Sequence, residues 1–227
     1  MLDVHLPHKP IHGFWEFLLH LFTISVGLLI ATQIESCVEW RHHVRLAEEA
    51  RTDLRAEIKG NLEALKAAQP AVKQWRETIH ADLEAMQRIQ EYPMDSKAQR
   101  TSLTIKSSGM TLSDTAWRTA QTTGALAYMP YEEAERYSSI YQAQAALLAY
   151  QEKPADDVAG ILGLITRYHW VGKRRITEEQ ASAVAERLGQ MQLHLTTGDL
   201  LLQRTIETSS AYLENRKARD SFTESVK

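Results

Sequence analysis

The chain has 227 residues, enough for one ordinary helical domain beside a membrane segment, and 24% of them are charged. Its formal net charge of −3 argues against a general nucleic-acid binder, which would carry a basic face. Cys37 is the only cysteine in the sequence, so an intrachain disulfide is excluded.

The first predicted element is an apolar segment near the start of the chain. Phe17 to Ile34 carries no formal charge, and about 18 helical residues cross a hydrocarbon core of roughly 30 Å. Trp15 and Trp40 flank it, as in aromatic belts. A cleaved signal peptide is less favoured, because the segment is long and lacks a basic leader and a small-x-small site. We predict a retained transmembrane helix over residues 14–36.

The charges beside this segment predict its orientation. The positive-inside rule counts Lys and Arg close to the membrane and largely ignores interspersed acids. Lys9 alone precedes the segment, whereas four arginines follow it, Arg41, Arg45, Arg51 and Arg55. We therefore predict a single-pass protein of the bacterial inner membrane with a cytoplasmic C-terminal domain. A periplasmic domain is the alternative.

Two helices separated by Pro70 are predicted next. Apolar residues recur at helical spacing, namely Val44, Ala47, Leu54, Ile58, Leu62 and Leu65. No helix breaker lies between them and the membrane segment, so a stalk helix should continue the transmembrane helix as far as Pro70. A second helix should follow Pro70 and end before Pro93, because proline interrupts helical hydrogen bonding.

The rest of the chain carries further helix-start signals. Ser113 precedes a predicted short helix over residues 114–127 and should cap it with its hydroxyl. Pro130 and Pro154 suit the first position of a helix, where the missing N–H costs nothing. Thr177 and Gln180 fit a capping box at the start of a last helix, which is predicted to reach residue 215.

Together these elements predict an all-α protein, in which a transmembrane helix continues into a long stalk helix and an antiparallel helical bundle follows. The predicted organisation is a polar tail at 1–13, the transmembrane helix at 14–36, a bundle domain at 37–217 that includes the stalk at 38–69 and an irregular, extended segment at 92–112, and a frayed tail at 218–227.

The predicted transmembrane helix has one face of small and polar residues, made by Glu16, His20, Thr23, Gly27 and Ala31. Gly27 and Ala31 form a small-x-x-x-small pattern that lets helices approach closely. We interpret Thr23, Gly27 and Ala31 as a helix-packing interface. Glu16 and His20 are candidate intramembrane ionisable residues, and in an oligomer they could instead form stacked rings that relay protons or hold a cation.

Other candidate sites are weaker. Glu39 and His43 stand four residues apart and could share a zinc ion, but two ligands do not make a site, and a solvated helix face is favoured. The basic and aromatic residues 167–175 could contact lipid headgroups, although cations at a helix end also complement its dipole. Since phosphate-loop, metalloprotease and hydrolase motifs are missing from the sequence, we predict no catalytic, cofactor or metal site and no enzyme.

Two segments carry a resemblance to a known kind of protein. Residues 26–35, VGLLIATQIE, resemble the anchor of uncharacterised bacterial single-pass membrane proteins catalogued as domains of unknown function. Residues 113–126, SDTAWRTAQTTGAL, together with the helix around Tyr137 and Tyr141, resemble their middle segment. The resemblance implies relatedness over about half of the chain and carries no activity to transfer.

These observations predict a membrane-anchored interaction or scaffold protein. Its expected partners are the lipid bilayer and either a second copy of the chain or another membrane protein, with no nucleic acid and no identified small-molecule substrate. One alternative is an accessory subunit of a transport or proton-driven complex. Another is a helical bundle that senses a ligand, because such bundles can bind small molecules between their helices.

Overall fold

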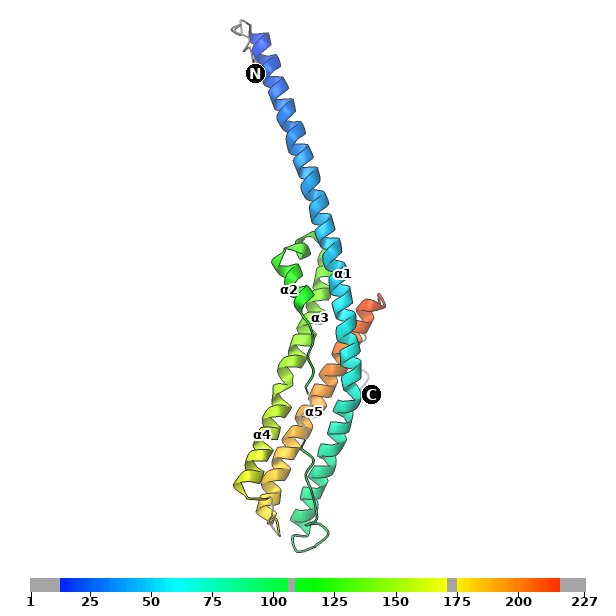
Figure 1. The fold of residues 1–227 in the computed structure, drawn as a ribbon, viewed down its shortest axis with the longest axis vertical. Helices are drawn as coiled ribbons and strands as arrows, with labels where there is room; N and C mark the ends of the chain where they lie inside the picture. The colour runs from blue at the N-terminus through cyan, green and yellow to red at the C-terminus, as the bar shows by residue number, and fades with distance from the viewer. Residues whose placement is uncertain (1–12, 106–108, 171–174, 217–227) are drawn as a thin grey trace, which may run out of the picture. The chain divides into compact units, whose positions relative to one another are not determined.

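The computed structural model describes residues 13–105, 109–170 and 175–216, and within these ranges every regular element is a helix (Figure 1). The elements are α1 (Phe14–Glu91), α2 (Thr115–Thr122), the 3-10 helix η1 (Ala125–Tyr128), α3 (Tyr131–Tyr150), α4 (Glu152–Arg167) and α5 (Glu178–Leu213). The predicted all-helical class is confirmed. The chain divides into two compact units, residues 1–49 and 50–227, and α1 contributes to both.

The interruption predicted at Pro70 is not found, because α1 continues through this residue. A proline inside a helix leaves the carbonyl four residues earlier without its N–H partner. Here Pro70 is exposed and so is Lys66, so the freed carbonyl of Lys66 lies on the solvent side of the helix. Leu65 and Trp75 on either side of the proline are buried, and their packing opposes a break.

The second unit has its core between α1, α4 and α5. The larger apolar cluster consists of Trp75, Ile79, Ala85, Met86 and Ile89 from α1, Ile161 from α4, Ala181, Val184, Leu188, Met191 and Leu195 from α5, and Ile176 just before α5. A smaller cluster joins Leu65, Leu147 and Leu202, which come from α1, α3 and α5. Each of these helices therefore buries one stripe of its surface.

Helix α5 packs along both α3 and α4, with the residue numbers running in opposite senses (Figure 1). Tyr212, near the end of α5, donates a hydrogen bond to Tyr137 in the first half of α3. His194, in the middle of α5, pairs with Asp157 of α4. A single residue, Gln151, separates α3 from α4, and both helices pack against α5.

Residues 92–114 form no helix or strand where the structure describes them. Side chains of α1 and of the junction between α3 and α4 bond its backbone instead. Gln151 accepts from the N–H of Met110 at 2.7 Å and donates to its carbonyl at 3.2 Å. Asn61 pairs in the same way with Ser113, at 2.9 and 2.7 Å. These bonds replace the ladder that an extended chain lacks when it has no neighbouring strand.

The ends of the later helices differ in detail from the predictions. The capping box of Thr177 and Gln180 is confirmed, with both reciprocal bonds present. Pro130 is the residue before α3 rather than its first residue, and Pro154 is the third residue of α4. The predicted helix 114–127 is split at Gly124, whose positive φ of 73° ends α2 and favours glycine.

Candidate functional site

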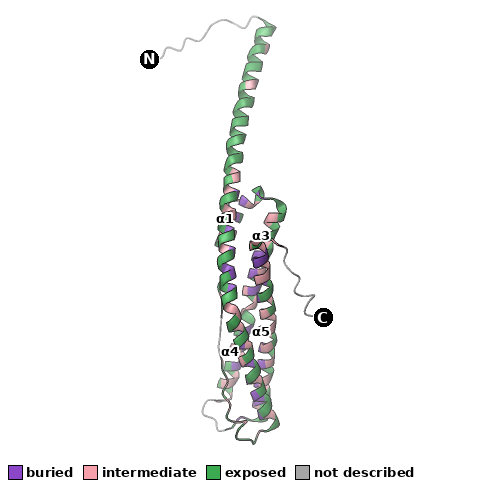
Figure 2. Cartoon of the chain, turned by 90° about the vertical axis from the view of Figure 1, so that its right-hand side faces the viewer, coloured by how far each residue is buried: buried purple, intermediate pink, exposed green. Residues whose placement is uncertain are grey.

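The first part of α1 is exposed along nearly its whole length (Figure 2), and its exposed residues include many large apolar ones. We call this set the exposed apolar surface of α1, and its members are Phe14, Trp15, Phe17, Leu19, Leu21, Phe22, Ile24, Leu28, Leu29, Ile30, Ile34, Val38 and Trp40. The segment is long and apolar enough to cross a membrane, and none of its most apolar 18 residues is buried. Surfaces of this kind mark contact with a membrane or another protein.

The residues of the predicted packing face all lie on this part of α1 and are exposed. The hydroxyl of Thr23 donates to the carbonyl of Leu19 at 2.8 Å, and His20 Nδ1 lies 2.9 Å from the carbonyl oxygen of Glu16. Both polar side chains therefore fold back on their own helix. A Cβ added at Gly27 would meet no atom within 4 Å, so the chain itself leaves this position open.

The weaker candidates gain no support from the structure. No group of three or more His, Cys, Asp or Glu side chains that could hold a metal occurs among the described residues, and Glu39 and His43 thus have no third ligand there. The basic cluster at 167–175 lies partly outside the described residues, since positions 171–174 are not described.

A polar network that the sequence analysis did not anticipate centres on Glu57 of α1. Its carboxylate accepts hydrogen bonds from the hydroxyls of Ser113 and Tyr141 and from the backbone N–H groups of Ala116 and Trp117. The two N–H groups belong to the first turn of α2, where backbone donors lack helical partners. Glu57 thus caps α2 from another helix, in addition to the predicted cap, in which the Ser113 hydroxyl accepts from the N–H of Thr115 at 3.4 Å.

The network changes the protonation equilibria of its members. Burial alone would raise the pKa of Glu57, but the bonds from Ser113, the Ala116 N–H, Tyr141 and the Trp117 N–H outweigh it and lower the pKa below the ordinary 4.5. Burial also raises the pKa of Tyr141, and the bond to Glu57 raises it further. The pair is therefore a carboxylate and a neutral phenol at neutral pH.

A second buried polar pair lies next to this network. Asn61 Nδ2 donates to Gln144 Oε1 at 2.9 Å, and the two residues are only 5% and 3% exposed. The Nε2 of Gln144 is buried and finds no hydrogen-bond partner among the residues that the structure describes. Buried donors are usually satisfied, so an orphaned carboxamide nitrogen calls for an explanation.

A third polar pair joins α4 to α5. Asp157 is 3% exposed, and its Oδ2 lies 2.6 Å from Nδ1 of His194. The ring of Tyr150 stands edge-on to the imidazole, with centroids 6.2 Å apart. Burying a carboxylate without a partner is strongly destabilising. The contact with His194 therefore offsets the cost of burying Asp157 at this position.

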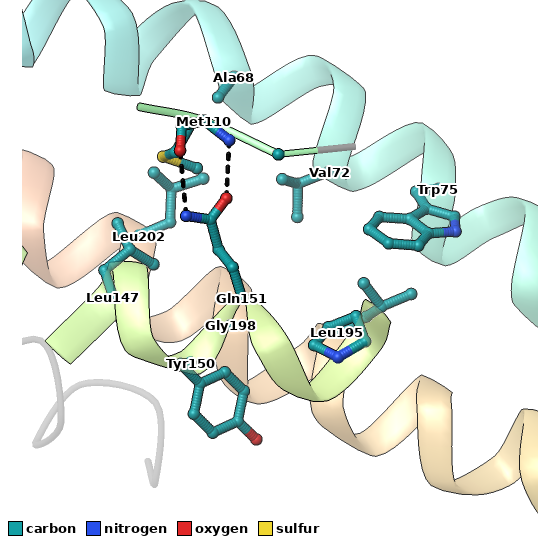
Figure 3. Close-up of a pocket in the computed structure, with 12 residues that line it drawn as sticks. Ala68, Val72, Trp75, Met110, Leu147, Tyr150, Gln151, Leu195, Gly198 and Leu202 are labelled. Atoms are coloured by element: carbon teal, nitrogen blue, oxygen red, sulfur yellow. Dashed lines mark hydrogen bonds between the residues drawn. The ribbon is translucent and has the colours of Figure 1, made fainter. Parts of the chain in front are cut away.

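Beside this pair lies an apolar cavity of about 60 Å³ that is partly open at the surface (Figure 3). Its wall includes the apolar side chains of Val72, Trp75, Leu147, Leu195 and Leu202. The carboxamide of Gln151 also faces the cavity, but both of its ends are bonded to Met110. The wall therefore favours apolar contents and offers little to a polar ligand.

Gly198 of α5 lines the same cavity and gives a direct test of its packing. A Cβ at this position would lie 3.7 Å from Cδ1 of Tyr150, an ordinary contact distance. We expect Gly198→Ala to raise the free energy of unfolding by about 1 kcal/mol, since alanine is the better helix former. Urea unfolding of the full chain in mild detergent measures this.

The matched control is Gly189→Ala on the same helix, where an added Cβ meets nothing within 4 Å. Both substitutions should gain from helix propensity, and only Gly198→Ala should gain the contact with Tyr150. Destabilisation by Gly198→Ala alone would mean that Tyr150 has less room than the structure gives it.

Sequence reasoning missed Asn61, Gln144 and Asp157 because no chemical motif contains them. A signal was nevertheless present. Each occupies a position of its helix where the helical repeat places apolar residues, as Asn61 does between Leu54 and Leu65. A polar residue in such a register predicts a buried hydrogen-bonded group.

Comparison of the chain with protein-family models, curated proteins and solved structures found no match.

Proposed function

We propose that this protein is a membrane-anchored helical scaffold without catalytic activity of its own. In this proposal the first part of α1 spans the bacterial inner membrane, and an antiparallel helical bundle follows it on the cytoplasmic side. The protein would assemble with a second copy or with another membrane protein, through the transmembrane helix and the bundle.

The observation that carries the proposal is the exposed apolar surface of α1. Its large side chains are exposed all along the segment, Phe22 and Trp40 to 70% and 66%, and lipid would remove them from water. Burying a single such side chain is worth about 1.5–3 kcal/mol, so this surface has a strong preference for an apolar environment. Arg41 and the arginines after it support the cytoplasmic orientation.

The assembly part of the proposal depends on Gly27 and its neighbours. Apolar side chains do not drive helices together in lipid, where close packing of small residues does. Thr23, Gly27 and Ala31 lie at helical spacing on one face, and the hydroxyl of Thr23 is already bonded to its own helix. The Thr23 hydroxyl can therefore enter a helix interface without being left unpaired.

Gly27→Ile tests this interface. A Cβ added at Gly27 meets nothing within 4 Å in the chain, so a loss of association reports a contact with another molecule. We expect association to weaken by about 1 kcal/mol or more, because such interfaces depend on close backbone approach. Analytical ultracentrifugation in density-matched detergent, or the yield of a co-purified partner, measures it.

Val26→Ile is the control, since position 26 lies about 100° away around the helix. It adds a methylene group without entering the small-residue face and should leave association unchanged. If Gly27→Ile assembles as the wild type does, the small-residue face is not an interface.

A further inference from the structure

Asp82 of α1 is a buried carboxylate outside the sites described above. It is 7% exposed and lies at helical spacing between the core residues Ile79 and Met86. The other buried carboxylate among the described residues, Asp157, is paired with His194. Asp82 forms no ion pair within the described parts of the chain, so its charge has no cation beside it there.

The partner of Asp82 belongs to an extended stretch, residues 101–105. The N–H of Thr104 donates to Oδ2 of Asp82 at 3.0 Å. Where the structure describes the chain, this is the only hydrogen bond that joins residues 101–105 to a helix. Leu103 and Ile105 pack against the larger apolar cluster but are only partly buried. The stretch is therefore held by two apolar side chains and by one bond to a buried carboxylate.

The charges of the neighbouring elements do not neutralise Asp82. Residues 101–105 contain no titratable side chain. The titratable side chains around them have other partners or are exposed, namely Glu77, His80, Glu84 and Arg88 on α1, Asp156, Asp157 and Arg167 on α4, Glu186, Arg187, His194 and Asp199 on α5, and Lys97 and Arg100 just before the stretch.

Burial makes the charged form of Asp82 unfavourable. It raises the pKa of this carboxyl above the ordinary 3.8, and the bond from Thr104, which acts in the opposite direction, does not cancel the effect. When residues 101–105 leave α1, water reaches the carboxyl and its pKa returns toward the ordinary value. The docked stretch thus binds the proton more tightly than the released one. By linkage, docking is favoured as the pH falls through the raised pKa and is opposed by the buried charge above it.

We infer that Asp82 makes the docking of residues 101–105 on α1 dependent on protons. The neutral carboxyl still accepts from Thr104 and holds the stretch, whereas the ionised carboxylate, buried without a cation, loosens it. Release uncovers the part of the apolar cluster against which Leu103 and Ile105 pack. The inference does not rest on the proposed scaffold function, since all of these residues belong to the second unit.

Asp82→Asn tests this device. The amide keeps an oxygen for the N–H of Thr104 and stays neutral at every pH, so it imitates the protonated carboxyl. Hydrogen exchange of the backbone amides of residues 101–105, in the full chain in mild detergent and corrected for the intrinsic pH dependence of exchange, reports docking. The variant should protect the stretch more strongly than the wild type at neutral pH, by about tenfold for each unit between the docked and released pKa values. The two proteins should converge as the pH falls through the raised pKa of Asp82.

Asp95→Asn is the matched control. Asp95 also accepts from a backbone N–H, that of Lys97 at 2.9 Å, but it is exposed and lies outside the stretch. This change should leave the protection of residues 101–105 as it is in the wild type at each pH. Equal protection in the wild type and Asp82→Asn at neutral pH would overturn the inference, and so would a difference that grows on acidification.

The carboxyl carbon signal of Asp82 in NMR spectra gives a second readout, which needs no variant. In the wild type its titration midpoint should lie above the ordinary 3.8, because burial favours the neutral form. A midpoint at or below that value would remove the proton dependence of docking and overturn the inference.

Discussion

Replacing Glu57 by alanine should lower the free energy of unfolding by about 2–3 kcal/mol. Hydrogen bonds to a charged group are strong, and their loss leaves the donor groups without an acceptor. The variant leaves the hydroxyls of Ser113 and Tyr141 without their acceptor. It also removes the cap from the first turn of α2. Urea unfolding of the full chain in mild detergent at neutral pH, followed by circular dichroism, measures the loss.

The control for this prediction is Glu63→Ala, on the same helix and exposed, which should change stability by less than about 0.5 kcal/mol. Equal effects of the two substitutions would show that the Glu57 network contributes nothing specific.

The same network predicts a dependence on pH. Because the folded protein lowers the pKa of Glu57, the contribution of this residue is present above the ordinary 4.5 and is lost as the pH falls through the folded-state pKa. The stability difference between wild type and Glu57→Ala should therefore shrink at acid pH. A difference that grows on acidification would contradict the direction of the shift.

Replacing His194 by alanine should cost about 3 kcal/mol, because it leaves the buried carboxylate of Asp157 without its partner. Burial of an unpaired charge is far more costly than the loss of an exposed contact. The measurement is again urea unfolding at neutral pH. His80 provides the control, since it pairs with Glu84 on the surface of α1, and both side chains are more than half exposed, at 62% and 51%.

A double substitution, Asp157→Leu with His194→Leu, tests whether stability depends on the polar character of these two side chains or only on the space that they fill. Apolar residues of similar size often replace a buried polar pair with little loss, so the double variant should be more stable than His194→Ala. If the double variant is the less stable of the two, an unpaired Asp157 costs less than replacing both side chains by leucine, and the expected effect of His194→Ala is not explained by a stranded carboxylate.

Local patterns predicted most of the helices for a physical reason. The apolar repeat of Leu54, Ile58 and Leu65 depends only on helical geometry, and all three residues are buried as the pattern requires. The capping box at Thr177 is equally local, because its bonds join residues three apart. Pro70 shows the limit of such signals, since packing on both sides carries the helix through it.

The cap of α2 could be predicted from nearby residues only in part. The Ser113 hydroxyl accepts from Thr115 as the start signal predicts, but the acceptor of the Ala116 N–H is Glu57, which is more than 50 residues away in the sequence. Asn61 and Gln144 are bonded to each other and are similarly distant, 83 positions apart in the sequence. Contacts of this range depend on which helices lie side by side, and the sequence pattern of one helix does not contain that information.

The sequence by itself determined the helical class, the apolar segment at the start and the irregular stretch before α2, because each depends on composition or on short-range periodicity. Only the tertiary structure decided which polar residues meet. Glu57 with Tyr141, Asp157 with His194, and the unpartnered nitrogen of Gln144 all arise where separate helices pack. Burial makes each of these groups depend on its neighbours, so their chemistry is a property of the packed helices.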